Sequence, residues 1–139
     1  MVVAVGTDVE HLQVGDEVVS ALALGCLAHY VTIRADLVLL KPKNLSFEAA
    51  ATLPIAFLTA HYGLNHLALL KRGERVLIHS AAGGVGQAAV QLAQLRGAQI
   101  FATASSPKWK FLQQQGVKQI MNSRTLEFAE QIKTATEGM

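Results

Sequence analysis

The second half of the chain, from residue 75 onward, alternates short apolar runs with longer segments whose apolar residues recur every three or four positions. The short runs lack the polar alternation of a half-exposed strand, so they are typical of strands buried in a parallel sheet. The longer segments have the spacing of helices that cover such a sheet. The pattern predicts strands at 76–80, 99–103 and 119–122, and helices at 84–96, 107–115 and 126–135. Three successive β-α units indicate a parallel sheet with right-handed crossovers.

Residues 1–45 follow a different pattern, rich in β-branched residues and interrupted by turn-forming glycine and aspartate. They predict short strands at Val2–Val5, Glu17–Leu22, Tyr30–Ile33 and Leu37–Leu40. Helices are expected to connect this part to the second half. Ser46 is a good N-cap for a short helix at Ala49–Thr52. We expect Pro54 to interrupt that helix and a longer helix to run from Phe57 to Leu70.

A glycine-rich turn, Ala81-Ala82-Gly83-Gly84-Val85-Gly86, separates the first predicted strand of the second half from its helix. A strand, a glycine turn and a helix in this order hold the pyrophosphate in dinucleotide-binding folds. Gly83 would let the backbone approach the phosphates, Gly86 would let the helix pack close to the strand, and the helix N-terminus offers free N–H groups. Ala81 replaces the first glycine of the G-x-G-x-x-G pattern. A purely structural glycine turn is the alternative interpretation.

The residues that follow the second predicted strand indicate which dinucleotide would bind. NAD-specific sites place a carboxylate about 20 residues after the glycine motif, where it holds the ribose 2′-hydroxyl. No acidic residue lies between Glu74 and Glu127. That stretch instead carries hydroxyl groups and cations that suit a 2′-phosphate, namely Ser105, Ser106, Lys108, Lys110, Ser123 and Arg124. NADPH is therefore the expected cofactor, and lysines on a solvated helix face are the alternative interpretation.

Composition argues against several other classes of protein. Hydrophobic residues make up 51% of the 139 residues and charged residues 16%, which excludes a disordered chain. The formal net charge of +2 gives no support to a nucleic-acid or membrane partner. No apolar run approaches the roughly 20 residues of a membrane span. The single cysteine, Cys26, excludes an internal disulfide and favours a reducing, cytoplasmic location.

Segments along almost the whole chain together resemble one enzyme superfamily. They are Val5-Gly6, Leu12 to Val18, Tyr30-Val31, Pro42 to Ala50, Leu53 to Ala60, Lys71 to His79, Ala81 to Gly86, Ala102 to Pro107 and Asn122 to Phe128. The chain resembles the medium-chain dehydrogenase/reductase superfamily, above all the enoyl reductase domains of modular polyketide synthases and animal-type fatty acid synthases. Because only half of a doubly wound fold is present, we expect a fragment of a larger enzyme.

The resemblance implies the following organisation and activity. Residues 1–45 would be a β-rich piece of a GroES-like substrate domain, residues 46–72 connecting helices, and residues 73–139 the first half of an α/β, NADPH-binding Rossmann domain. The implied reaction is NADPH-dependent reduction of an α,β-enoyl thioester on an acyl carrier protein, beside neighbouring synthase domains and compatible with a homodimer. A free-standing NADPH-dependent quinone oxidoreductase and a non-catalytic nucleotide-binding fragment remain alternatives.

The resemblance also implies roles for individual residues. The pyrophosphate would lie against Ala82, Gly83, Gly84, Val85 and Gly86. Thr59 falls in a segment that reaches the nicotinamide in similar enzymes. The adenosine 2′-phosphate would lie near Ser105, Lys108 and Ser123, with Arg124 as a neighbour. No proton donor is identified in this segment.

A zinc site is not expected, although some members of this superfamily carry one. Zinc needs several Cys, His or carboxylate ligands brought together. The chain has one cysteine, and residues 53–60 contain no ligand. His61 and His66 are five residues apart, which does not place them on one helical face. His79 ends the first strand of the second half, where a packing or hydrogen-bonding role is the simpler interpretation.

Overall fold

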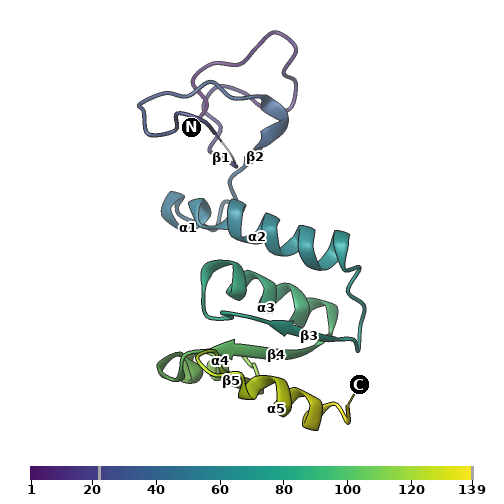
Figure 1. The fold of residues 1–139 in the computed structure, drawn as a ribbon. Helices are drawn as coiled ribbons and strands as arrows, with labels where there is room; N and C mark the ends of the chain where they lie inside the picture. Colours follow the sequence, from purple (N-terminus) through teal and green to yellow (C-terminus); the bar gives the residue numbers. More distant parts are fainter. Residues whose placement is uncertain (22, 139) are drawn as a thin grey trace. The chain divides into compact units, whose positions relative to one another are not determined.

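The computed structural model describes residues 1–21 and 23–138, so Leu22, the predicted end of one strand, and Met139 lie outside the described residues. The chain divides into two compact units, Met1–Ile55 and Ala56–Met139 (Figure 1). This division falls inside the segment 46–72 that was expected to connect two parts. Across the described residues, none of the helices combines the length and the apolar character needed to cross a membrane.

The N-terminal unit contains little regular structure. Strands β1 (Val18–Ser20) and β2 (Val38–Leu40) pair antiparallel, and the single turn of 3-10 helix η1 (Ala35–Leu37) precedes β2. Helix α1 (Phe47–Ala51) begins two positions before the predicted Ala49. Ser46 caps it as predicted, because its hydroxyl oxygen accepts the Ala49 N–H at 3.2 Å.

Two strand predictions in this unit were wrong. The backbone is irregular at Val2–Val5 and at Tyr30–Ile33. Val2 exchanges backbone hydrogen bonds with Gly15 and Asp16, but the pairing does not extend into a ladder. Tyr30 is 75% exposed. A β-branched composition does not by itself create a strand, because a strand needs a neighbour to accept and donate its hydrogen bonds.

Helix α2 (Leu53–His61) begins before Phe57, the predicted start. The predicted interruption next to Pro54 is confirmed, because α1 ends at Ala51 and α2 is a separate helix. Pro54 is the second residue of α2, where a helix needs no N–H donor, so α2 includes it instead of beginning after it. After His61 the backbone widens into the π-helical segment η2 (Tyr62–Leu67), which ends short of the predicted Leu70. Such widened turns are rare, and the apolar spacing of the sequence does not reveal them.

The C-terminal unit has the predicted β-α alternation. Its elements are β3 (Arg75–Ile78), α3 (Gly84–Arg96), β4 (Gln99–Ala104), the 3-10 turn η3 (Ser106–Lys108), α4 (Trp109–Gln114), β5 (Gln119–Asn122) and α5 (Glu127–Ala135). The three strands form one parallel sheet in the order β3-β4-β5, with Ile78 opposite Ala102 and Ala104 opposite Asn122. This is the α/β arrangement expected for the first half of a doubly wound fold.

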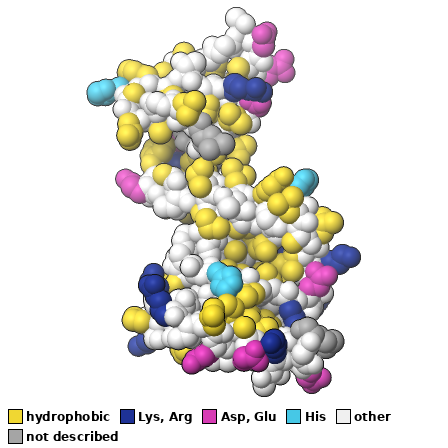
Figure 2. Space-filling model, in the orientation of Figure 1, with side chains coloured by type: hydrophobic (Ala, Val, Ile, Leu, Met, Phe, Trp, Pro, Cys, Tyr) yellow, Lys and Arg dark blue, Asp and Glu magenta, His cyan; other side chains and the backbone are white. Residues whose placement is uncertain are grey.

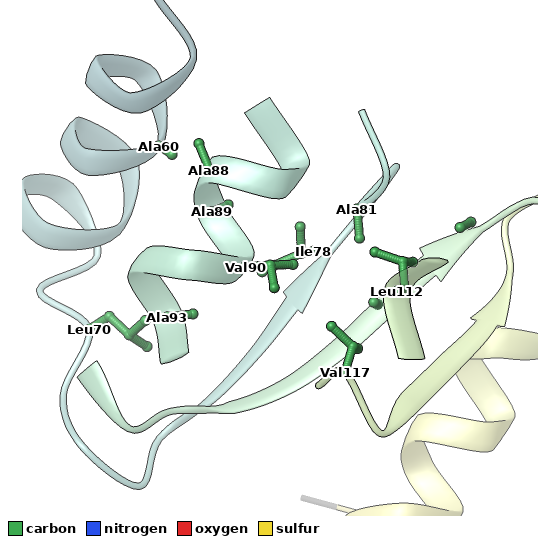
Figure 3. Packing of buried hydrophobic residues seen from close by; sticks show 12 residues of the cluster. Ala60, Leu70, Ile78, Ala81, Ala88, Ala89, Val90, Ala93, Leu112 and Val117 are labelled. Carbon is green, nitrogen blue, oxygen red and sulfur yellow. The ribbon is translucent and has the colours of Figure 1, made fainter. Parts of the chain in front are cut away.

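The core of this unit lies between α2, α3 and the sheet (Figure 3), and small side chains dominate it. Ala60 of α2 and Ala88 of α3 point toward one another, and Val90 of α3 lies against Ile78 of β3. Alanine at these positions lets the two helices and the strands approach closely. The close approach fixes where the N-terminus of α3 meets the end of β3.

Candidate functional site

The turn between β3 and α3 is held in a tight, defined conformation. Ser80 adopts the left-handed backbone region with φ of 52°, which is uncommon for a residue other than glycine. Its carbonyl oxygen accepts the Gly83 N–H at 2.8 Å. Gly83 then begins α3 as an extended N-cap residue, with φ of −84° and ψ of 170°. Five residues, 79–83, therefore connect the end of β3 to the first residue of α3.

Gly86 is the glycine that this packing requires. A Cβ atom at this position would clash with the carbonyl oxygen of Ser80 and would lie 2.7 Å from the Cα of Ala81. Both are backbone atoms, so neither can rotate away. A Cβ on Gly83 would meet the same Ser80 oxygen at 3.2 Å, whereas one on Gly84 would meet nothing within 4 Å. The predicted reason for Gly86, close packing of the helix against the strand, agrees with this geometry.

The N-terminus of α3 is open on its outer side. Gly84 and Val85 are exposed, and no side chain hydrogen-bonds to the helix at its N-cap. The first N–H groups of a helix have no acceptor within the helix, so they carry partial positive charge toward whatever lies in front of them. Ala82 is half-buried, and its carbonyl oxygen accepts the side-chain amide of Gln87 at 3.2 Å. This arrangement suits an anion such as a pyrophosphate.

Thr103 of β4 lies beneath this turn, and sequence reasoning missed it. The side chain is buried, with 1% of its surface exposed. Its Oγ1 lies 3.0 Å from Nδ1 of His79 and 3.4 Å from the Ser80 nitrogen, and its carbonyl oxygen accepts the Ala81 N–H at 3.0 Å. The His79 ring also lies edge-on to Phe128, with centroids 5.2 Å apart. No local pattern could have shown contacts between residues 24 positions apart in the chain.

A second group of predicted residues gathers where β4 and β5 end. Because Ala104 lies opposite Asn122, the residues that follow them, Ser105 and Ser123, leave neighbouring strands at the same edge of the sheet. The carbonyl oxygen of Ala104 accepts two hydrogen bonds, from the Trp109 indole at 3.0 Å and from the Ser123 N–H at 3.1 Å. Two loops are thereby attached to one backbone atom.

Lys108 and Arg124 belong to the same two loops. The Lys108 N–H donates to the Ser105 carbonyl at 2.9 Å, and the Arg124 N–H donates to Oδ1 of Asn122 at 2.9 Å. Both cationic side chains are exposed, and neither forms an ion pair with a described residue. Figure 2 shows Lys and Arg side chains at the edge of this unit where Figure 1 places the start of α4. Hydroxyls and free cations at this edge suit a phosphate group.

Thr59 contacts neither the glycine turn nor the residues that follow β4 and β5. It is exposed on α2, beside the buried Ala60. An open hollow of about 590 Å³ in this unit, lined in part by Gly73, Glu74 and Arg75, lies where β3 begins, at the end of the strand away from the glycine turn. The hollow therefore does not include the glycine turn or the ends of β4 and β5.

The comparisons with known proteins agree with this arrangement. Residues 84–139 match a family model described as zinc-binding dehydrogenase. The chain is 47% identical over 139 residues to a mycocerosic acid synthase-like polyketide synthase of Mycobacterium tuberculosis, spanning 99% of this chain and 7% of that protein. It is 60% identical to the crystal structure of the CurK enoyl reductase, with a TM-score of 0.95 over 98% of this chain and 41% of the other. The chain belongs to the medium-chain dehydrogenase/reductase superfamily.

Within that superfamily it corresponds to a segment of the enoyl reductase domains of polyketide synthases, as the resemblance indicated. A quinone oxidoreductase of Escherichia coli, solved as a complex with NADPH, shares the fold at 36% identity, with a TM-score of 0.88 over 98% of this chain and 42% of that one. The chain spans less than half the length of each of these relatives.

The family description mentions zinc, and the residues of this chain do not fit that metal. Among the described residues, no three His, Cys, Asp or Glu side chains come together as a metal site would require. Cys26, the only cysteine of the sequence, is exposed in the N-terminal unit.

Proposed function

We propose that this chain supplies the pyrophosphate and 2′-phosphate portions of the NADPH site of an enoyl reductase. Two features of one sheet carry the proposal. The N-terminus of α3 is open, and the ends of β4 and β5 are followed by cationic and hydroxyl residues with no acidic residue between them. The first feature suits the diphosphate common to all nicotinamide dinucleotides. The second distinguishes NADPH from NADH, because cations attract a 2′-phosphate whereas the missing carboxylate would have repelled it.

We propose the following contacts between these residues and the cofactor. The backbone from Ala82 to Gly86 would lie against the pyrophosphate. The 2′-phosphate would lie among four side chains, those of Ser105, Lys108, Ser123 and Arg124. Thr59, exposed on α2, is proposed to face the nicotinamide in the complete domain.

When bound, NADPH supplies the hydride that adds to the β-carbon of an enoyl thioester, and a proton then adds at the α-carbon. This chain's part is to bind and orient the cofactor, and we assign the proton donor to none of its residues. The substrate is proposed to be an α,β-enoyl thioester on an acyl carrier protein, presented by neighbouring synthase domains. The support is similarity to polyketide synthases over 99% of the chain.

A titration of the full chain with NADPH and NADH, followed by nicotinamide fluorescence, tests the cofactor proposal. Tighter binding of NADPH supports it. Equal binding of both dinucleotides contradicts the 2′-phosphate assignment, and no binding of either contradicts the site as a whole.

A second candidate function is quinone reduction, which the similarity to a quinone oxidoreductase in complex with NADPH favours. The two functions share the cofactor and differ in the electron acceptor. NADPH oxidation measured with an enoyl thioester of pantetheine and with a simple quinone separates them. Turnover with the quinone alone would contradict the enoyl reductase proposal.

A further inference from the structure

We propose that Thr103 is a positioning residue for the pyrophosphate site: together with His79 it fixes the glycine turn from beneath, without touching the ligand. This inference rests on the proposed dinucleotide-binding function. Thr103 is the first residue of β4 beyond the Ile78–Ala102 pair, at the point where β3 gives way to the turn. On its other side it lies opposite Met121 of β5, so the sheet holds its backbone in place.

From this position Thr103 meets three consecutive residues of the turn. Its Oγ1 contacts the His79 ring and the Ser80 nitrogen, and its carbonyl oxygen accepts the Ala81 N–H. Those residues flank the strained backbone of Ser80, whose φ is 52°. A left-handed conformation at a residue other than glycine persists only where its surroundings hold it. Thr103 provides those surroundings.

The proton arrangement around Thr103 follows from what each group can donate. The Ser80 nitrogen can only donate, so Oγ1 accepts there, although at 3.4 Å the bond is long. The hydroxyl hydrogen is then left to donate to Nδ1 of His79 at 3.0 Å. This arrangement puts the ring hydrogen on Nε2, and in the other tautomer the Nδ1–H donates to the second lone pair of Oγ1. In either tautomer the His79 ring is a side-chain hydrogen-bond partner of the buried Thr103 hydroxyl.

The consequence for the ligand comes through Ser80. Its carbonyl oxygen accepts the Gly83 N–H and lies against Gly86, so the orientation of Ser80 sets where α3 begins and where its free N–H groups point. A turn that relaxes in the free protein must be returned to this conformation when a diphosphate binds, and that cost weakens binding. Because the diphosphate is common to NADH and NADPH, the weakening applies equally to both.

The experiment uses the full chain with Thr103→Val, which keeps the shape and removes the hydroxyl, and Thr103→Ser, which restores it. For Thr103→Val we expect the Kd values of NADPH and NADH to rise together by about three- to tenfold, with their ratio unchanged. Thr103→Ser should remain within about twofold of the wild type. A Thr103→Val protein that binds as tightly as wild type, or that loses affinity for NADPH alone, overturns the inference.

Two further measurements keep the outcome decisive. If Thr103→Val does not fold, His79→Phe removes the other partner of the same bond from an exposed position, and unchanged binding of both dinucleotides by that variant overturns the inference. Hydrogen exchange of the Ser80 and Ala81 amides in the ligand-free chain reads the turn directly and should be faster when the Thr103 hydroxyl is removed. If wild type binds neither dinucleotide, the proposed function fails, whereas unchanged exchange rates in the variant overturn the positioning role alone.

Discussion

The carbonyl oxygen of Ser80 occupies the space that a Cβ atom on Gly86 would need. Both groups belong to the backbone, and the hydrogen bond from Gly83 to the same oxygen prevents Ser80 from turning away. The position of α3 relative to β3 therefore depends on the absence of a side chain at residue 86. This relationship leads to the first prediction.

Gly86→Ala should destabilise the chain by at least about 2 kcal/mol, because relief of the clash requires α3 to move away from β3. Gly84→Ala is the matched control, since a methyl group there meets nothing within 4 Å and the residue is helical. The control should be neutral or more stable by up to about 1 kcal/mol. Urea denaturation of both variants measures the difference, and equal stability of the two would contradict the packing argument.

Lys108→Ala should weaken NADPH binding by about tenfold and leave NADH binding unchanged, because in the proposed site the lost charge faces only the 2′-phosphate. Lys118→Ala makes the same change in net charge just before β5, at the opposite end of that strand, and should alter neither affinity. Fluorescence titrations with both dinucleotides check this. An equal loss of NADPH affinity in the two variants would mean that Lys108 acts only through the general charge of the protein.

Trp109→Phe should lower the free energy of unfolding by about 1 kcal/mol, because it removes the indole hydrogen bond to Ala104 while keeping an aromatic ring. The Ser123 N–H still reaches the same oxygen, so the end of β5 should stay in place. Thermal unfolding gives the stability, and amide shifts of Ser105 and Ser123 show which loop moves. A larger shift at Ser123 than at Ser105 would count against this assignment.

The pKa of Asp36 should lie below its ordinary value, because the Arg34 guanidinium donates to both carboxylate oxygens, at 3.0 and 2.6 Å. For a lowered pKa, the stabilisation is present above the unfolded-state value and is lost as the pH falls through the folded-state value. Carboxyl NMR titration of wild type and Arg34→Ala measures the shift. The pKa should return toward the ordinary value in the variant, and an identical pKa in both proteins would refute the pairing.

The β-α alternation of the C-terminal unit was predictable, because each strand and each helix has its own local pattern of apolar residues and the pattern repeats three times. The bounds of α3 were predicted at residues 84–96, where a glycine turn precedes the helix and Gly97, with φ of 69°, ends it. A short apolar run such as residues 99–103 predicts a buried strand even when the neighbouring strand is unknown. Adjacency of Ser105 and Ser123 then follows from parallel pairing, since both come directly after paired strand residues.

The rest depended on contacts that a sequence pattern does not contain. Val2–Val5 has the composition of a strand but no ladder to join, and the π-helical segment η2 has ordinary helical spacing. The hydrogen bond between Thr103 and His79 joins residues that are 24 positions apart in the chain. The left-handed conformation of Ser80 lies beside this contact and is not apparent from the sequence around it. The start of α2 was predicted too late, because a proline is accepted in the first turn of a helix and α2 therefore begins before Pro54.

The two hydrogen bonds accepted by the Ala104 carbonyl oxygen affect which residues at this edge of the sheet can be substituted. The atom that anchors both loops belongs to the main chain, so its hydrogen bonds do not depend on the side chains of its neighbours Ser105, Lys108, Ser123 and Arg124. Evolution can therefore vary the charge at this edge while the loops that present it remain attached. If these side chains hold the 2′-phosphate as proposed, a few surface substitutions change the dinucleotide preference without altering the fold.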